Sequence, residues 1–196
     1  ARPQLSAVNC LQYKEILILG KNSPALRPTM YDFLVYRSID LLQQLYWAQQ
    51  YFKQTELTNS QLLAPIEDFL QVKINASSYD INPNIVQLYQ QLLRTLIAAK
   101  RTDAIIISDL DRLTFINQNV NIPNKDSLYL NTLERLSRKY HDNPYSVEIL
   151  NVIAQYYYNP SYGYYIPREN SRSSQAKLLS DYEKILKICN DGIQRF

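Results

Sequence analysis

Apolar residues recur every three or four positions along most of this chain, which is the spacing of one face of an α-helix. The first run predicts a helix over 4–19 that ends at Gly20, shortly before Pro24. A second helix is expected to begin at Thr29, because Asp32 three residues later completes a capping-box pattern. One stripe of this second helix contains Leu34, Ser38, Leu41, Leu45, Ala48 and Phe52.

The second half of the chain predicts a series of helices. The helix after Pro83 and the one that starts near Asp103 are almost contiguous, and so short a connection favours antiparallel neighbours. Their stripes are Ile85, Leu88, Leu92, Leu96 and Ala99, then Ile106, Leu110, Leu113 and Ile116. Two more helices follow, over about 126–140 and 145–158. The last helix has a continuous stripe of Ala176, Leu179, Tyr182, Leu186, Cys189 and Ile193.

Periodicity weakens between these regions. We therefore expect a single helical domain over 1–196, with N-terminal helices in 1–54, an irregular linker in 55–82 that holds a short helix within 65–72, and helix pairs in 83–196. The fold class is all-α. Two architectures fit this pattern. One is a set of antiparallel helix hairpins stacked as a tetratricopeptide-like array (an α-α superhelix), and the other is an irregular helical bundle.

Composition narrows the function classes. A chain of 196 residues with 46% hydrophobic residues is able to bury a core, which argues against intrinsic disorder. The net charge of +3 lacks the cationic excess of a nucleic-acid-binding surface, and 3 glycines exclude glycine-rich phosphate loops. Because no run of about 18 apolar residues occurs, we expect no membrane span.

Candidate catalytic groups are sparse. His141 is the only histidine, so histidine-based triads and multi-histidine metal sites are not expected. Asp109 and Asp111 lie two residues apart and would face different sides of a helix, which favours solvated faces or ion pairs over acid–base catalysis. We expect no enzyme activity, no cofactor and no metal. A disulfide between Cys10 and Cys189 and two separately packed thiols are both possible.

The most unusual local composition is aromatic. Tyrosine offers a large, stiff contact area with a polar tip and is enriched in binding surfaces. A candidate interaction surface therefore comprises Tyr156, Tyr158, Tyr162, Tyr164, Tyr165, Arg168 and Arg172. The alternative is that Tyr157 and a neighbour fill the helical core while the others hold the loop in place.

Several blocks occur in an order that is similar to a known family. These blocks are Pro28–Leu34, Arg37–Asp40, Ser108–Ile116, Leu133–Leu136, Ile153–Tyr158 and Ile188–Phe196. Together, over about 28–196, they resemble the helical, tetratricopeptide-like N-terminal region of the large alpha-2-macroglobulin-family proteins of Bacteroidetes. That resemblance implies a piece of a larger exported protein, periplasmic or associated with the outer membrane, that continues into β-sandwich domains.

Members of that family are thought to entrap proteases, many through a thioester built from Cys-Gly-Glu-Gln. Neither Cys10-Leu11-Gln12 nor Cys189-Asn190-Asp191 matches this motif, so no trap residue transfers to this chain. The resemblance implies a non-enzymatic scaffold or interaction domain of a protease inhibitor. Its partners would be other domains of the same chain, proteases or an envelope protein. The alternative is a glycan-binding helical module that uses the Tyr156–Tyr165 cluster.

Overall fold

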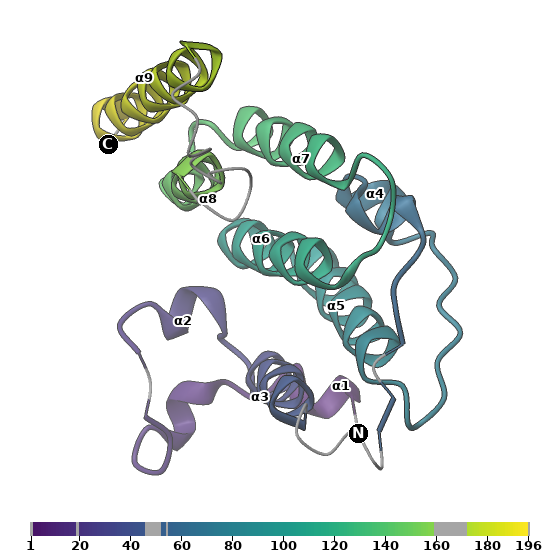
Figure 1. Cartoon of the computed structure of the whole chain (residues 1–196). Coiled ribbons are helices and arrows are strands. Elements are labelled where there is room, and N and C mark those ends of the chain that lie inside the picture. The colour runs from purple at the N-terminus through teal and green to yellow at the C-terminus, as the bar shows by residue number, and fades with distance from the viewer. Residues whose placement is uncertain (1, 19, 46–51, 54, 159–171, 196) are drawn as a thin grey trace. The chain divides into compact units, whose positions relative to one another are not determined.

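A computed structural model describes residues 2–18, 20–45, 52–53, 55–158 and 172–195 (Figure 1). Within these ranges the chain is all-α, with isolated β-bridges and no β-sheet, which confirms the fold class. The choice between a stacked array and an irregular bundle stays a prediction. The elements are α1 (Arg2–Leu5), η1 (Cys10–Tyr13), α2 (Ser23–Leu26), α3 (Met30–Gln44), η3 (Ser60–Leu63), α4 (Ile66–Phe69), α5 (Ile81–Ala98), α6 (Thr102–Asn119), α7 (Lys125–Lys139), α8 (Ser146–Tyr158) and α9 (Arg172–Arg195).

The chain divides into two compact units, residues 1–129 and 130–196. Helix α7 begins in the first unit and ends in the second. The single helical domain expected over 1–196 and its division at 54 and 82 stay predictions.

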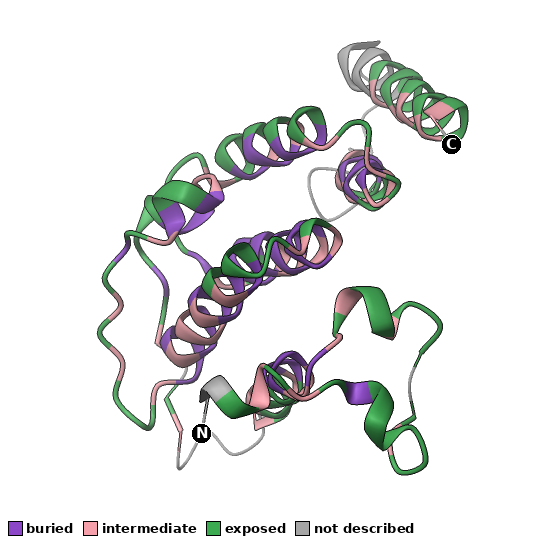
Figure 2. Ribbon diagram, turned by 180° about the vertical axis from the view of Figure 1, so that it is seen from behind, coloured by how far each residue is buried: buried purple, intermediate pink, exposed green. Residues whose placement is uncertain are grey.

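Helices α5 and α6 form the core of the first unit and pack against each other (Figure 2). Most residues of the predicted stripes face inward, but Leu88 is only partly buried and Ala99 is exposed. Those at most 1% exposed are Ile85, Leu92, Leu96, Ile106, Leu113 and Ile116. Helix α5 ends where Lys100 adopts a left-handed φ of 54°. There the Arg101 N–H donates to the Leu96 carbonyl at 3.1 Å, a contact typical of a helix C-terminus.

The start of α3 confirms the capping-box prediction. The Asp32 N–H donates to Thr29 Oγ1 at 3.3 Å, and Asp32 Oδ2 accepts from the Thr29 N–H at 3.0 Å. The predicted stripe is not the buried one, however, because Leu34 is 43% and Leu41 59% exposed. The residues of α3 that lie inside are Tyr31, Asp32, Val35, Tyr36 and Ile39.

The helix expected over 4–19 is wrong. Helix α1 ends at Leu5, and turns lead to η1. Asn9 caps η1 by accepting from the Leu11 N–H at 2.9 Å, and Cys10 donates its N–H to the Pro28 carbonyl at 2.9 Å. A local side-chain cap and a long-range backbone bond thus replace the hydrogen bonds that a continuous helix would need.

The stretch expected as an irregular linker is packed onto α5 and α6 in its described part. It contains η3 and also α4, which confirms the short helix expected within 65–72. Gln90 donates to the carbonyls of Phe69 at 3.0 Å and Val72 at 2.9 Å. The buried side chains of this stretch are Leu57, Leu62, Leu63, Ile66, Phe69 and Val72.

The second unit contains the pair α8 and α9, which pack against each other. On α8 the buried apolar side chains are Ile149, Leu150, Ile153 and Ala154. Gly192 of α9 lies against this helix, since a Cβ built there would be 3.6 Å from Leu150 Cδ1. Close approach at Gly192 thus fixes which side of α9 faces α8.

Candidate functional site

Arg112 and Asp109 form a completely buried ion pair in the first unit. The exposed fractions of these residues are 0% and 1%. Arg112 Nε donates to Asp109 Oδ1 at 3.0 Å and Nη2 donates to the same oxygen at 2.5 Å. Of the two expected arrangements, a solvated face is wrong for these residues, and an ion pair is present, within α6 rather than between helices.

The remaining contacts of Arg112 explain its burial. Its Nη1 donates to the carbonyl of Leu62 at 2.7 Å and to that of Ala64 at 3.1 Å. Its guanidinium carbon lies 4.4 Å from the centre of the Phe69 ring. A buried charge is stable only when it is paired and hydrogen-bonded. The pair with Asp109 lies within α6, and the contacts with Leu62, Ala64 and Phe69 fasten the 60–69 stretch to that helix. Asp109 and Arg112 thus act as structural residues.

Asp111 belongs to a second polar cluster, which links α3 and α6. The Tyr36 hydroxyl is 2.8 Å from Ser108 Oγ and also hydrogen-bonds to Asp111. The guanidinium of Arg27 lies 3.8 Å from the centre of the Tyr36 ring. Burial raises the pKa of Asp111 to about 6, with the charge of Asp40 adding to the rise, while Arg27 and the Tyr36 hydroxyl oppose it.

As predicted, Asp109 and Asp111 do not converge. One pairs with Arg112 and the other with Tyr36, so they lie in separate clusters. Acid–base work on a bond requires two positioned groups around the same reacting atom. Asp111 has the raised pKa of a proton donor, but its partners are Tyr36, which links α3 to α6, and Arg27.

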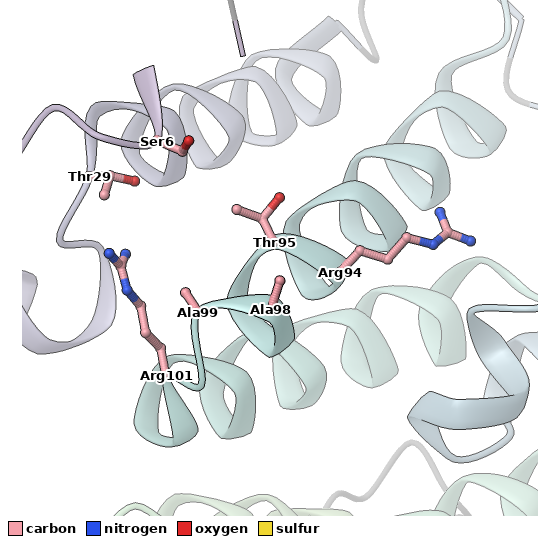
Figure 3. Close-up of a pocket in the computed structure, with 7 residues that line it drawn as sticks. All are labelled: Ser6, Thr29, Arg94, Thr95, Ala98, Ala99 and Arg101. Carbon is pink, nitrogen blue, oxygen red and sulfur yellow. The ribbon is translucent and has the colours of Figure 1, made fainter. Parts of the chain in front are cut away.

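A pocket of about 480 Å³ lies beside the C-terminal half of α5 (Figure 3). Its lining residues are Ser6, Thr29, Arg94, Thr95, Ala98, Ala99 and Arg101. Figure 3 shows the Arg101 guanidinium directed toward Thr29 and that of Arg94 directed away from it.

Both arginines of this pocket have partners within the chain. Arg101 Nη1 lies 3.0 Å from Asp32 Oδ2, and Arg94 Nη2 donates to the Leu70 carbonyl at 2.5 Å. Asp32 is fully buried, and its Oδ1 has no hydrogen-bond partner among the described residues. What remains for a ligand is a set of hydroxyl and methyl groups, which offers weak, shallow contact rather than a reactive centre.

The predicted tyrosine surface is described only in part. Tyr156 and Tyr157 meet edge to face, with ring centres 5.7 Å apart and an 84° angle between their planes. Tyr157 lies under the ammonium group of Lys184 on α9, at 5.0 Å, and burial raises its pKa. Tyr158 is 64% exposed. The packing alternative thus describes Tyr157 well, and a contact surface is compatible with Tyr158.

The rest of that surface lies outside what the structure describes. Tyr162, Tyr164, Tyr165 and Arg168 fall in 159–171, and Arg172 starts α9 without a described side chain. Their role in binding stays a prediction.

Among the described residues there is no group of three or more His, Cys, Asp or Glu side chains that would hold a metal ion. His141, which is 62% exposed at its side chain, contacts Asp142 Oδ1 at 2.8 Å. In the described part of the chain, every helix is too short or too polar to span a lipid bilayer. Cys10 is buried and Cys189 is exposed, and both thiols are free.

The surface feature that the sequence did not predict is on α9. The stripe of this helix is exposed, with Leu179 and Leu186 both at 63% and Ile193 at 77%. Figure 2 shows the described part of this helix mostly in the colour of exposed residues. The signal in the sequence was the small residue Gly192, which lies off the stripe and marks the side that approaches α8.

Comparison with known proteins gives no match: no protein-family model, curated protein or solved structure is similar to this chain.

Proposed function

We propose that this chain is a non-enzymatic helical scaffold domain that acts through protein contacts. One observation carries the proposal: in the described residues, buried charges fasten the fold together while large apolar side chains lie exposed. The Arg112–Asp109 pair is engaged with backbone carbonyls, whereas the α9 stripe is open. Exposed apolar patches on a folded domain mark contact surfaces for other macromolecules.

The resemblance of the sequence blocks refines this proposal. We place the domain at the front of an alpha-2-macroglobulin-like protease inhibitor of the bacterial cell envelope, exported to the periplasm or the outer membrane. Its partners are then other domains of the same long chain, proteases or an envelope protein. The support is the order of the sequence blocks together with the all-α fold.

The native reading frame around this segment tests that placement. We expect an export or lipoprotein signal upstream and a long β-rich chain downstream. A stop codon directly after the codon for Phe196 would contradict the inhibitor assignment. It would leave a small helical binding protein, and the non-enzymatic scaffold proposal would then be tested separately by substrate assays.

The non-enzymatic assignment has its own test. Ester, glycoside and peptide substrates are incubated with the wild-type chain, with Asp111→Asn and with Glu134→Gln. Asp111 has the raised pKa of a candidate acid, and Glu134 is a partly exposed carboxylate on α7. We expect that neither substitution will abolish turnover of any of these substrates. Turnover lost in a variant that retains its helical circular dichroism would overturn the assignment.

Glycan binding is the second candidate, and the exposure of Tyr158 favours it. Tyr79 in the first unit is a matched control, since it is 65% exposed against 64% for Tyr158. In calorimetry with oligosaccharides, heat that is lost in Tyr158→Ala and kept in Tyr79→Ala would support stacking on Tyr158. Absence of heat with every glycan would contradict this candidate.

A further inference from the structure

The exposed face of α9 has the spacing of a helix–helix seam. Leu179, Tyr182, Leu186, Cys189 and Ile193 follow one another at alternating steps of three and four residues. This is the 3.5-residue period of the a and d positions in a coiled coil, over about two heptads. Such a period fits another helix lying alongside better than a flat or irregular partner.

The seam is separate from the face that α9 uses inside its own unit. Gly192 approaches Leu150 and Val147 of α8, and Arg195 Nη1 donates to Ser146 Oγ at 3.5 Å. Lys184 covers the Tyr157 ring. Helix α9 is therefore already anchored by other positions, and the seam does not have to pack against α8 for the unit to form.

The seam is exposed to solvent and contains no charged residue. Leu179, Leu186 and Ile193 are 63%, 63% and 77% exposed, Tyr182 is 48% exposed, and the thiol-bearing Cys189 is exposed as well. No charged residue occupies a seam position between Leu179 and Ile193. A nucleic acid or an acidic partner would require positive charges there, and an uncharged seam instead suits an equally apolar helix.

The area of the seam matches what a symmetric pair needs. Its side chains leave on the order of 500 Å² of mostly apolar surface per copy, so two copies would cover on the order of 1,000 Å². That lies at the lower end of specific interfaces. In a two-fold pair each seam residue contributes twice, which a small patch requires if it is to give measurable affinity.

The edges of the seam are also compatible with a second copy. Glu183 is the charged residue beside the seam on the side away from α8. In an antiparallel copy each flank of the seam faces the same flank of the other copy, and the flank of Glu183 also holds the uncharged Asn190. With the seams overlapping in heptad register, Glu183 lies nearest Asn190 of the second copy, so two glutamates do not meet.

We propose that two copies of this chain associate through α9, with the Leu179–Ile193 seams packed against each other. This deepens the proposed scaffold function, on which it rests, by naming the partner as a second copy. The seam is then buried in the dimer, and its apolar residues become core residues of a four-helix arrangement made from α8 and α9 of both copies.

Sedimentation of the full chain over a concentration series tests the proposal. At about 100 µM we expect a species of twice the 23.0 kDa of one chain, which dissociates on dilution. Leu186→Asp places a charge in the seam and should shift the dissociation constant upward at least tenfold. Ser180→Asp, which adds the same charge on the exposed polar side of α9, should leave it unchanged.

Cross-linking gives a second readout that does not depend on a variant folding well. In a two-fold pair with the seams in register, the two Cys189 residues lie within about one turn, or 5.4 Å, of each other along the axis in either helix direction. A short bis-maleimide should yield a covalent dimer in the wild type and none in Cys189→Ser, while the buried Cys10 stays unmodified.

The outcomes separate this inference from the broader proposal. A monomer at every concentration, or a dimer that Leu186→Asp leaves intact, would overturn self-association through α9. Neither result bears on the two broader proposals. The non-enzymatic scaffold function is contradicted only by the substrate assays, and the alpha-2-macroglobulin placement only by the reading-frame test.

Discussion

Helices α5 and α6 and helix α9 present the same sequence pattern and opposite structural outcomes. In α5 and α6 the predicted stripe is core, with Leu92 and Leu113 at 0% exposed. In α9 an equally regular stripe is on the surface, with Leu186 at 63%. Periodicity therefore identifies a helix and its apolar face, but which face is covered depends on the neighbour that the fold supplies.

The difference lies in what surrounds each helix. Helices α5 and α6 are joined by three residues, and the 57–72 stretch packs onto them through Gln90 and Arg112. Helix α9 contacts α8 through a different side, at Gly192. The apolar stripes of α5 and α6 are thus buried within the chain, whereas the stripe of α9 is left exposed and available for association.

The largest expected effect on stability comes from removing the buried ion pair of α6. Arg112→Ala leaves Asp109 buried without its cation and frees the carbonyls of Leu62 and Ala64, so we expect a loss of about 3–5 kcal/mol in the free energy of unfolding. Arg138→Ala is the matched control, because its ion pair with Glu134 is exposed and should contribute about 0.5 kcal/mol or less. Urea denaturation measures both, and equal losses would contradict the structural role.

A matched pair of leucines tests the two stripes directly. Leu92→Ala opens a cavity in the core and should lower the unfolding free energy by about 2–5 kcal/mol. Leu186→Ala removes surface contacts and should change it by less than about 0.5 kcal/mol at concentrations where the chain is monomeric. Similar losses at both positions would mean that the α9 stripe is buried within its own chain.

The partly buried Asp111 on α6 adds a pH dependence to this comparison. The pKa of Asp111 is about 6 in the folded chain and about 3.9 when unfolded, so the fold favours its protonated form. Between about pH 4 and pH 6 the unfolded chain binds fewer protons, and stability should fall by up to about 3 kcal/mol as the pH rises. Asp111→Asn should remove this fall and be more stable than the wild type at pH 7.

The exposed Asp191 of α9 is the control for that experiment, since Asp191→Asn should leave the fall between pH 4 and pH 6 in place. Asp80 acts in a different window. Hydrogen bonds from Thr55 and Ser77 lower its pKa to about 2, so its contribution is present above about pH 4 and is lost as the pH falls toward 2. A wild-type stability that does not change between pH 4 and pH 6 would contradict the burial of Asp111.

The smallest expected effect concerns the α8–α9 contact. Gly192 is helical, and an added methyl would meet Leu150 and Val147 at ordinary contact distances of 3.6 and 3.8 Å. Gly192→Ala should therefore raise the unfolding free energy by about 0.5–1 kcal/mol through helix propensity. Thermal unfolding followed by circular dichroism checks this, and a destabilised variant would show that the two helices approach more closely than described.

Sequence reasoning found most of the helices because their local signals agree. The capping box at Thr29 and Asp32 and the stripes of α5 and α6 all depend on neighbouring residues in the chain. The helix expected over 4–19 failed because Cys10 bonds to Pro28, a contact that local periodicity does not contain. Local chemistry predicts elements, and long-range backbone bonds then select among them.

The site was less predictable for the same reason. The spacing of Asp109 and Asp111 correctly indicated different faces, yet the burial of Arg112 requires carbonyls at Leu62 and Ala64, about fifty residues away. For α9 the sequence supplied the stripe but not its exposure, since the side that is covered depends on the contact of Gly192 with α8.

The rate at which Cys189 reacts with a maleimide tests the central claim most directly, because this thiol lies within the α9 seam and Cys10 is a buried internal reference. The account predicts that Cys189 reacts far faster than Cys10 in dilute solution and that its rate falls as the chain concentration rises and the seam becomes covered by a second copy. A Cys189 that is as slow as Cys10 in dilute solution, or whose rate is independent of concentration, would contradict it.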